Sequence, residues 1–456
     1  MIIRNLYDDK LAQASYLIGC GATGDAMVID PTRGADLYVK LAASLGLKII
    51  AVTETHIHAD YLSGSRELAA ATGAKIYLSD EGGSDWIYGY ANDPNVVLVR
   101  DKARISIGNI SFEVWHTPGH TPEHISFLLT DHPVSSVPHS LFAGDCIFVG
   151  DVGRPDLLER AANIAGTMEL GARTLFRTLS KFKDLPDSLL VWPGHGSGSA
   201  CGKSLGGSPV TTLGYERQSN WAFKISSEDK FVDEILSGQP EPPLYFKEMK
   251  FRNRQGPEIL SGFPSISPSK ELVGQVIDIR SASQIRNGFY VGSTAVPYGK
   301  TFVSWCGWVV KYDSPVTLIA DSQVAADVAA HDMALIGLDH VVGWVAPSDL
   351  DQSLLEPFQT IPATSIEPTA QVLDVRGTGE WNMSHVKGAI HIPYGYLRDR
   401  LASLAKDKKT IVHCASGGRS PIAYSILRNA GFNDLWELSG GMAEIEIEAP
   451  EVLQAT

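Results

Sequence analysis

The sequence predicts a mixed α/β protein that consists of several domains. Its 456 residues suggest about three domains at roughly 150 residues each. In the first half, short β-rich runs end in glycine, proline, aspartate or histidine and alternate with helical patterns, as at 61–72 and 171–182. In the second half, the chain repeats itself at a nearly constant offset. We therefore expect rigid sheets whose loops carry the reactive groups.

The repeat predicts two copies of one α/β module, which we place at residues 265–352 and 353–456. In this alignment, Asp321 of the first copy takes the place of Cys414 in the second. Before the repeat we expect one domain at 1–245 and a linker rich in proline and glycine at 246–264. Four segment pairs match in the same order, at offsets of 93 to 96 residues: 276–280 with 372–376, 297–299 with 393–395, 317–321 with 410–414, and Gly337 with Gly431.

The composition is that of a globular protein, and it excludes several classes of function. A formal net charge of −14 disfavours nucleic acid and anionic membranes as partners. No apolar run approaches the roughly 18 residues of a membrane span, and Asp8 and Asp9 stand where a signal peptide would need its apolar segment. Five scattered cysteines form no disulfide framework. We therefore expect a soluble, cytoplasmic protein whose functional cysteines act as thiols.

Histidines and carboxylates gather at the ends of four predicted strands in the first domain. Residues 56–61 read His-Ile-His-Ala-Asp-Tyr, and three later loops contribute His120, Asp145 and His195. Nitrogen and oxygen donors of this kind are the ligands that first-row divalent metals prefer. Any one of these histidines alone is most simply a hydrogen-bonded loop residue, but their joint pattern predicts a metal site.

Residues 1–240 resemble the metallo-β-lactamase superfamily, whose signature is His-x-His-x-Asp-His followed by single His, Asp and His positions. The resemblance implies an αββα sandwich. Tyr61 replaces the last histidine of the first motif, which holds the second metal in binuclear hydrolases, so one metal is expected. The stretches HIHAD, TPGHT, GDCIFVGDVGRPDL and PGHGSGSACGKSLG look like the persulfide dioxygenase branch. That resemblance implies His56, His120 and Asp145 as the metal ligands.

Two histidines and one carboxylate form the facial arrangement of non-haem Fe(II) oxygenases, which leaves positions open for O2 and a persulfide sulfur. The resemblance therefore implies one Fe(II) per chain and O2 as co-substrate, although the donor set alone would also accept zinc. It further places His58, Asp60, Tyr61 and His195 around the metal, where such groups either orient the ligands and bound water or make purely structural hydrogen bonds.

Two further residues of this domain are candidates for contact with the substrate. Arg154 suits bidentate contact with a carboxylate, either on the substrate or on the protein's own Asp156. Cys201 follows His195 in a loop rich in glycine and serine, where it either enters the site and carries sulfur or is a small buried side chain. The sequence leaves both choices open.

The second copy contains a strand, a glycine-bearing loop and a helix start in the order that cradles an anion. The strand 410–412 leads into the loop His-Cys-Ala-Ser-Gly-Gly-Arg-Ser at 413–420. Backbone N–H groups and the positive end of the following helix favour a negatively charged sulfur on Cys414. This loop, together with LDVR, EW, HVKGAIHIP and LSGGM, resembles the rhodanese family. The resemblance implies that Cys414 carries the sulfur and that Arg419 stabilises the anionic substrate. Ser416, Gly417, Gly418 and Ser420 would form the cradle around the sulfur.

The first copy would then be an inactive rhodanese-like domain, because a carboxylate at Asp321 cannot accept sulfane sulfur. Together the resemblances imply a bifunctional enzyme that oxidises a low-molecular-weight persulfide to sulfite and thiol, and transfers sulfane sulfur through Cys414 to sulfite. We expect a homo-oligomer, although the sequence gives neither the number of subunits nor the carrier thiol (glutathione, coenzyme A or another). A two-zinc thioester hydrolase of the glyoxalase II type and a non-catalytic sulfur sensor are the alternatives.

Overall fold

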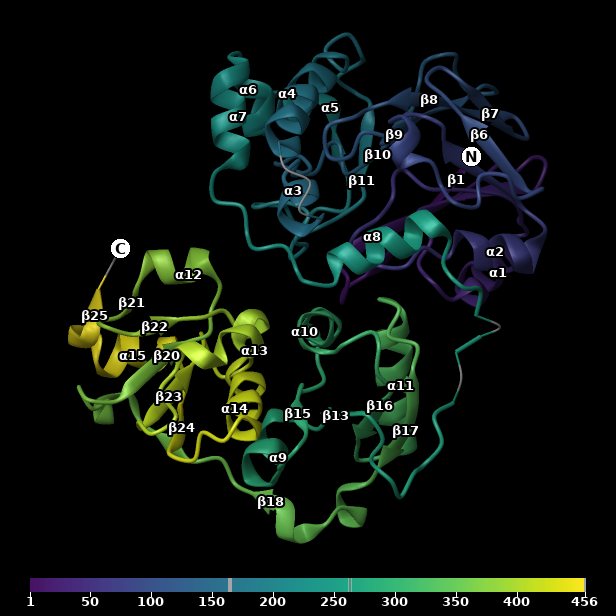
Figure 1. Cartoon of the computed structure of the whole chain (residues 1–456). Coiled ribbons are helices and arrows are strands. Elements are labelled where there is room, and N and C mark those ends of the chain that lie inside the picture. The colour runs from purple at the N-terminus through teal and green to yellow at the C-terminus, as the bar shows by residue number, and fades with distance from the viewer. Residues whose placement is uncertain (163–165, 261, 264, 455–456) are drawn as a thin grey trace. The chain divides into compact units, whose positions relative to one another are not determined.

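A computed structural model describes residues 1–162, 166–260, 262–263 and 265–454. The chain divides into two compact units, unit 1 (Met1–Phe263) and unit 2 (Pro264–Thr456) (Figure 1). Within these described ranges, every helix is too short or too polar to cross a membrane.

Two six-stranded sheets form the centre of unit 1, with the orders β1-β2-β3-β4-β5-β6 and β12-β11-β10-β9-β8-β7. The strands are β1 (Ile2–Asp8), β2 (Gln13–Gly19), β3 (Asp25–Ile29), β4 (Lys48–Thr53), β5 (Lys75–Ser79), β6 (Val96–Val99), β7 (Arg104–Ile107), β8 (Ile110–His116), β9 (Ile125–Asp131), β10 (Ser140–Gly144), β11 (Leu190–Pro193) and β12 (Thr211–Thr212). The helices are α1 (Ala35–Ser44), α2 (Ser65–Thr72), α3 (Leu157–Ala162), α4 (Thr167–Ser180), α5 (Leu213–Ser219), α6 (Trp221–Lys224), α7 (Glu228–Leu236) and α8 (Phe246–Gln255).

Three apolar clusters show that unit 1 is a four-layer αββα sandwich. One cluster, around Phe127, lies between the two sheets. A second packs α1 and α2 against the first sheet through Leu68, and a third packs α4 and α7 against the second sheet through Leu175 and Phe231 (Figure 1). Burial of one apolar face per sheet and one stripe per helix accounts for this layering. The expected αββα arrangement is confirmed.

The four loops with metal-type ligands leave the C-terminal ends of β4, β8, β10 and β11. Gly144 ends β10 with a φ of +51°, and a Cβ there would lie 2.7 Å from the side chain of Thr55. Only glycine allows the β4 and β10 loops to approach so closely. The helices expected at 61–72 and 171–182 are present with shifted bounds, as α2 and α4.

The prediction of a linker at 246–264 is wrong for residues 246–255, which form α8. The buried Asn253 side chain holds this helix against the loop after β4. Its Oδ1 accepts from Ser63 N–H at 2.9 Å, and its Nδ2 donates to the carbonyls of His58 at 2.8 Å and Tyr61 at 2.7 Å. Local sequence could not show these contacts, because their partners lie about 190 positions away. Residues 261 and 264 lie outside the described residues.

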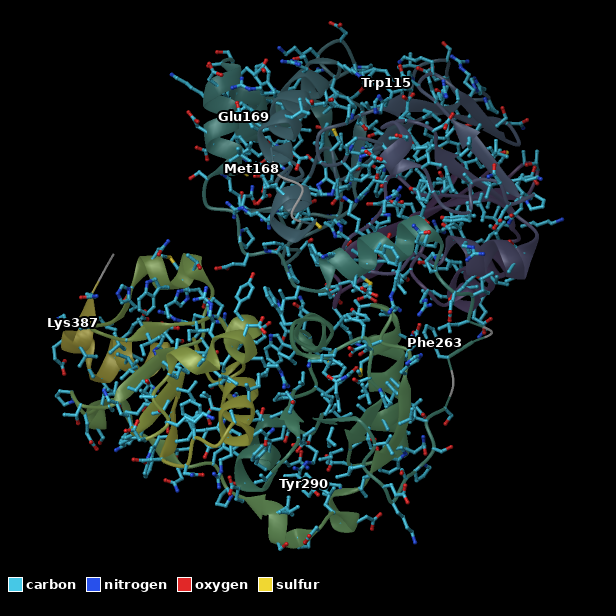
Figure 2. All side chains as sticks on the ribbon, in the orientation of Figure 1. Trp115, Met168, Glu169, Phe263, Tyr290 and Lys387 are labelled. Carbon is cyan, nitrogen blue, oxygen red and sulfur yellow. The ribbon has the colours of Figure 1, made fainter. Side chains whose placement is uncertain are left out.

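Unit 2 contains two parallel sheets whose first four strands have the same order, β15-β13-β16-β17 and β22-β20-β23-β24, with β19 next to β24. Side chains fill the space around each sheet, as Tyr290 does beside Ile319 and Val345 (Figure 2). The strands are β13 (Gln275–Asp278), β14 (Phe289–Tyr290), β15 (Thr294–Ala295), β16 (Val316–Ile319), β17 (Val341–Val345), β18 (Leu355–Glu356), β19 (Thr360–Ile361), β20 (Gln371–Asp374), β21 (His385–Val386), β22 (Ile390–His391), β23 (Thr410–His413), β24 (Leu435–Leu438) and β25 (Leu453–Gln454). The helices are α9 (Ala282–Asn287), α10 (Phe302–Val309), α11 (Gln323–Ala334), α12 (Thr378–Met383), α13 (Leu397–Arg400), α14 (Ser420–Asn429) and α15 (Met442–Glu448).

The strand register corrects the alignment of the two copies by one residue. Asp278 pairs with Ile319, and the equivalent Asp374 pairs with His413. The residue that follows each partner is Ala320 in the first copy and Cys414 in the second. The expectation that Asp321 occupies the sulfur position is therefore wrong, and a methyl group stands there instead.

The loops after these strands also differ in length. In the first copy, residues 320–322 connect β16 to α11, whereas residues 414–419 connect β23 to α14. The longer loop of the second copy curves around its sulfur. The loop of the first copy is too short to form such a curve.

Replacing Asn253 with alanine should destabilise unit 1 by about 3 kcal/mol, because it leaves buried backbone groups of the β4 loop without partners. Urea unfolding, combined with hydrogen exchange of residues 56–64, measures the effect. Asn92→Ala is the matched control, because Asn92 is an exposed turn residue. Equal stability of the two variants would contradict the anchoring role of α8.

Candidate functional site

His56, His120 and Asp145 converge in the interior of unit 1. Their side chains are at most 3% exposed. Asp145 Oδ2 lies 3.9 Å from His56 Nε2 and 3.5 Å from His120 Nε2. One ligand atom from each of the three residues lies within 4.8 Å of the others. The three resemblance-derived ligands are thus close enough to share one ion.

Hydrogen bonds fix which ring nitrogen of each histidine faces Asp145. His120 Nδ1 donates to the carbonyl of Arg154 at 2.9 Å. His56 Nδ1 donates to Thr55 Oγ1 at 3.0 Å, because the Thr55 hydroxyl itself donates to a carboxylate. Burial lowers the pKa of both rings well below the usual histidine value. Both Nε2 atoms therefore present lone pairs toward Asp145.

The Asp145 carboxylate lacks a hydrogen-bond donor on either oxygen among the described residues. Burial raises its pKa to about 6, with the neighbouring Asp60 charge contributing. Lone pairs that face an unpaired buried carboxylate are unfavourable unless a cation lies between them. These donors fit a divalent metal ion, and they would leave its remaining positions open.

A second group, Asp60, His195 and Cys201, adjoins this triad. His195 Nδ1 donates to the Ala12 carbonyl at 3.0 Å, and its Nε2 lies 3.3 Å from Asp60 Oδ2 and 3.5 Å from Asp145 Oδ1. Burial opposes protonation of His195, but the two carboxylates raise its pKa overall. Burial and the same carboxylates raise the pKa of the Cys201 thiol well above its usual value. The site therefore favours a protonated Cys201.

His58 and Tyr61 direct their polar atoms to a third buried group rather than to the triad. His58 Nε2 lies 3.1 Å from both Asp30 Oδ1 and Glu54 Oε2, and these carboxylates raise its pKa well above the usual value in spite of burial. The Tyr61 hydroxyl donates to the Asp30 carbonyl at 3.3 Å. Asp30 and Glu54 were missed in the sequence because isolated acidic residues carry no motif.

The structure decides between the two interpretations of Arg154. Its guanidinium is fully buried and contacts Asp156 through two hydrogen bonds of 2.7 Å, while Nη1 donates to the Ala200 carbonyl at 3.1 Å. The assignment of Arg154 to substrate binding is therefore corrected. Its backbone carbonyl instead orients His120, and its side chain braces the loop after Asp145.

In unit 2, the loop after β23 curves around the buried sulfur of Cys414. Gly417 N–H donates to Sγ at 3.2 Å, and the Ser420 hydroxyl lies 3.5 Å from Sγ. Gly417 has a φ of +87°, which favours glycine. Ser416 and Gly418, also expected in the cradle, make no hydrogen bond to Sγ within the described part of the chain.

Arg419 acts on the sulfur through charge rather than through a hydrogen bond. Its Nη1 and Nη2 donate to the two carboxylate oxygens of Glu380 at 2.6 and 2.7 Å. Burial opposes its charge, but Glu380 and Cys414 together raise the pKa of Arg419. The guanidinium is therefore held beside the loop by Glu380.

Comparisons with known proteins agree with both domains. Residues 8–195 match the family model of the metallo-beta-lactamase superfamily, and residues 362–448 match that of the rhodanese-like domain. A crystal structure of a metallo-beta-lactamase from Staphylococcus aureus subsp. aureus COL is 42% identical, covers 76% of this chain and 99% of its own, and superposes with a TM-score of 0.71. The chain belongs to the metallo-β-lactamase superfamily.

Two curated relatives with different activities are similar to the first domain. The mitochondrial persulfide dioxygenase ETHE1 of Bos taurus is 27% identical over 53% of this chain and 84% of its own length. A hydroxyacylglutathione hydrolase of Rhodospirillum rubrum is 32% identical over 40% of this chain and 60% of its own length. The protein is thus a metallo-β-lactamase domain with persulfide dioxygenase homologues, fused to a C-terminal rhodanese-like domain.

Replacing His120 with alanine should lower the bound metal to below about a tenth of the wild-type amount, because a facial site with two ligands binds weakly. Elemental analysis of the purified full-length variants measures this. His132→Ala is the control, since His132 lies exposed at the end of β9. Full metal occupancy in His120→Ala would contradict the assigned ligand set.

Proposed function

We propose that unit 1 is a persulfide dioxygenase with one Fe(II) held by His56, His120 and Asp145, and that Cys414 is the centre of a thiosulfate-forming sulfurtransferase. The observation that carries this proposal is the pairing of two sites in one chain. One is a buried triad that fits a divalent metal ion, and the other is a backbone cradle around a single sulfur. Oxidation of persulfide sulfur to sulfite links them, because sulfite accepts sulfane sulfur.

The proposed oxidation converts a persulfide RSSH, O2 and water into RSH, sulfite and two protons. The terminal sulfur loses four electrons and O2 gains them. Iron bound at the triad supplies the redox chemistry that zinc lacks. Asp60 and His195 hold the protons that water releases, on Oδ2 and Nε2, which lie 3.3 Å apart. Arg154 keeps His120 in the ring orientation that leaves Nε2 deprotonated.

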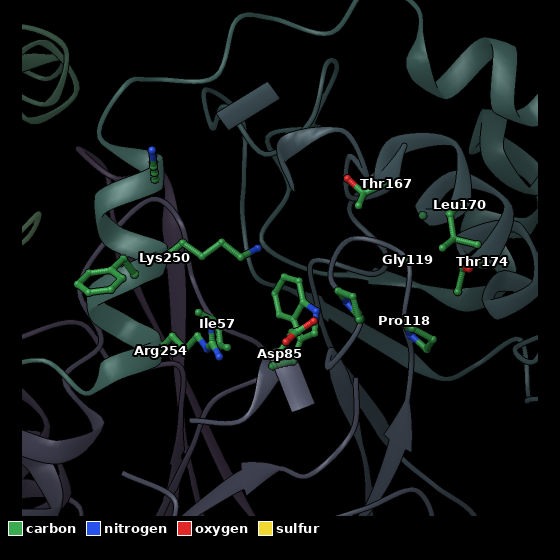
Figure 3. Close-up of a pocket in the computed structure, with 14 residues that line it drawn as sticks. Ile57, Asp85, Pro118, Gly119, Thr167, Leu170, Thr174, Lys250 and Arg254 are labelled. Atoms are coloured by element: carbon green, nitrogen blue, oxygen red, sulfur yellow. The ribbon is translucent and has the colours of Figure 1, made fainter. Parts of the chain in front are cut away.

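A cavity of about 630 Å³ beside the triad provides room for the carrier thiol. The lining includes Ile57 and Gly119, which are sequence neighbours of the ligands, and the basic Lys247, Lys250 and Arg254 of α8 (Figure 3). Figure 3 shows the Lys250 side chain extending from α8 across the cavity. Three basic residues favour an anionic carrier, such as a thiol that bears carboxylates or phosphates.

At the second site, the Cys414 thiolate attacks the terminal sulfur of a persulfide. The donor's S–S bond breaks, RS⁻ leaves, and a Cys414 persulfide forms. Sulfite then attacks the outer sulfur of that persulfide, which yields thiosulfate and returns the thiolate. The Gly417 N–H stabilises the sulfur anion in both steps. Fusion of the two domains raises the local concentration of sulfite near Cys414.

A two-metal thioester hydrolase remains the second candidate, because Asp60, His195 and Cys201 also converge and a hydroxyacylglutathione hydrolase is among the relatives. Two metals per chain with hydrolysis of a glutathione thioester would favour it. Tyr61 argues for the dioxygenase, since its ring replaces an imidazole of the binuclear signature.

Oxygen uptake and thiosulfate formation by the full-length protein test the proposal. With Fe(II) and glutathione persulfide, the protein should consume one O2 per sulfite. Cys414→Ser should keep this uptake and should lose more than about 90% of anaerobic thiosulfate formation from persulfide and added sulfite. Absence of O2 uptake, or unchanged thiosulfate output in Cys414→Ser, would overturn the corresponding half.

The KM for an anionic persulfide should rise as the pH passes about 8. Burial lowers the pKa of Lys250 to about 8, with Glu123 opposing the shift, so the ammonium loses its charge above that pH. Loss of one attractive charge should raise KM about fivefold, or about 1 kcal/mol. Lys250→Arg retains its charge and should show a KM that differs little between pH 7 and 9. Parallel pH profiles for wild type and Lys250→Arg would contradict the role of Lys250.

A further inference from the structure

The hydroxyl group of Ser420 contacts both the sulfur of Cys414 and a buried carboxylate. Ser420 Oγ donates to Glu437 Oε1 at 2.6 Å, and Glu437 on β24 is only 2% exposed. The single Ser420 proton cannot serve this carboxylate and the sulfur at once. An uncompensated charge on Glu437 would therefore retain the Ser420 proton and repel an anionic sulfur.

The compensating charge comes from the first copy, which has Ala320 in place of the cysteine. Arg286 lies on α9 of the first copy. Its Nε and Nη2 donate to the two oxygens of Glu437 at 2.7 Å each, and Nη2 also donates to the Gly417 carbonyl at 2.6 Å. The Glu437 hydrogen bonds raise the pKa of Arg286, and the charge of Cys414 adds to this effect. The guanidinium therefore neutralises the carboxylate and holds the loop at the same time.

The loop itself is shaped to receive this arginine. A Cβ on Gly417 would lie 3.0 Å from Arg286 Nη2, and a Cβ on Gly418 would lie 3.1 Å from the ring of Trp305 on α10. Because a trans peptide is planar, fixing the Gly417 carbonyl on Arg286 turns the Gly418 N–H to the opposite side. Both glycines of the loop are thus packed against the first copy.

We propose that Arg286 is a positioning residue for sulfur transfer at Cys414, and that the first copy, which has Ala320 at the sulfur position, is retained because it supplies this guanidinium. The inference rests on the proposed sulfurtransferase function. Arg286 cancels the Glu437 charge, which frees the Ser420 hydroxyl to turn toward an anionic sulfur, and it fixes the peptide between Gly417 and Gly418. Arg419 does not duplicate this role, since its guanidinium is paired with Glu380.

Charge-compensating variants of the full-length protein test this role. Two anaerobic measurements are made: thiosulfate formation from glutathione persulfide and sulfite, and the rate of Cys414 alkylation by uncharged iodoacetamide, followed by mass spectrometry. Arg286→Gln should slow both by about tenfold. Glu437→Gln combined with Arg286→Gln should restore alkylation to within about threefold of wild type, because the opposing charge is gone. Arg286→Lys, which keeps the charge, should alkylate close to the wild-type rate.

Arg428→Gln is the matched control, since Arg428 also makes a bidentate pair, with Glu356, away from the Cys414 loop. It should leave both rates within about twofold of wild type. Wild-type rates in Arg286→Gln, or a double variant as slow as Arg286→Gln, would overturn the inference. Wild-type protein that alkylates normally but forms no thiosulfate would instead refute the proposed sulfurtransferase.

Discussion

The structure of unit 1 depends on an electrostatic conflict at its centre. Two neutral imidazoles direct lone pairs at a buried carboxylate that has no donor among the described residues. Their outer nitrogens are already committed to Thr55 and to the Arg154 carbonyl, so ring rotation cannot relieve the conflict. A cation bound between these groups would remove the conflict. Three features hold the ligand side chains in this geometry: the four strand ends, the close approach at Gly144, and the ion pair between Arg154 and Asp156.

The proposed sulfur transfer sets unit 2 the reverse problem, because that reaction requires a negatively charged sulfur. Backbone N–H groups do so without a metal, provided that the loop has enough residues to curve and that nearby carboxylates are neutralised. The two copies divide these requirements. One has the longer loop with Cys414, and the other supplies Arg286 and Trp305 to its surface. The first copy, which has no cysteine at the sulfur position, thus contributes two side chains that contact the Cys414 loop.

Local patterns in the sequence were sufficient for the features that depend on neighbouring residues. Strand ends, the glycine loop and the His-x-His motif are all visible within a few positions. The αββα layers followed from the resemblance, and three apolar clusters bear them out. Long-range contacts are not visible in this way. The local sequence predicts a linker where α8 forms, because the loop that Asn253 binds lies about 190 positions away.

The register between strands and the partners of charged side chains are also not visible in the local sequence. Sequence alignment places the sulfur position of the first copy one residue too late, because the segments before β16 and β23 differ in length and only strand pairing reveals by how much. The sequence leaves open whether Arg154 binds a carboxylate of the substrate or Asp156, and the structure shows the buried pair with Asp156. Arg286 carried no motif at all, since its importance arises from a carboxylate 151 positions later.

Anomalous diffraction at the iron absorption edge, on crystals of the full-length protein loaded anaerobically with Fe(II), locates the ion between its ligands. We expect one strong peak, about 2.1 Å from His56 Nε2, His120 Nε2 and an oxygen of Asp145. A peak enclosed by Asp60, His195 and Cys201 instead, or two peaks of equal height, would contradict this expectation.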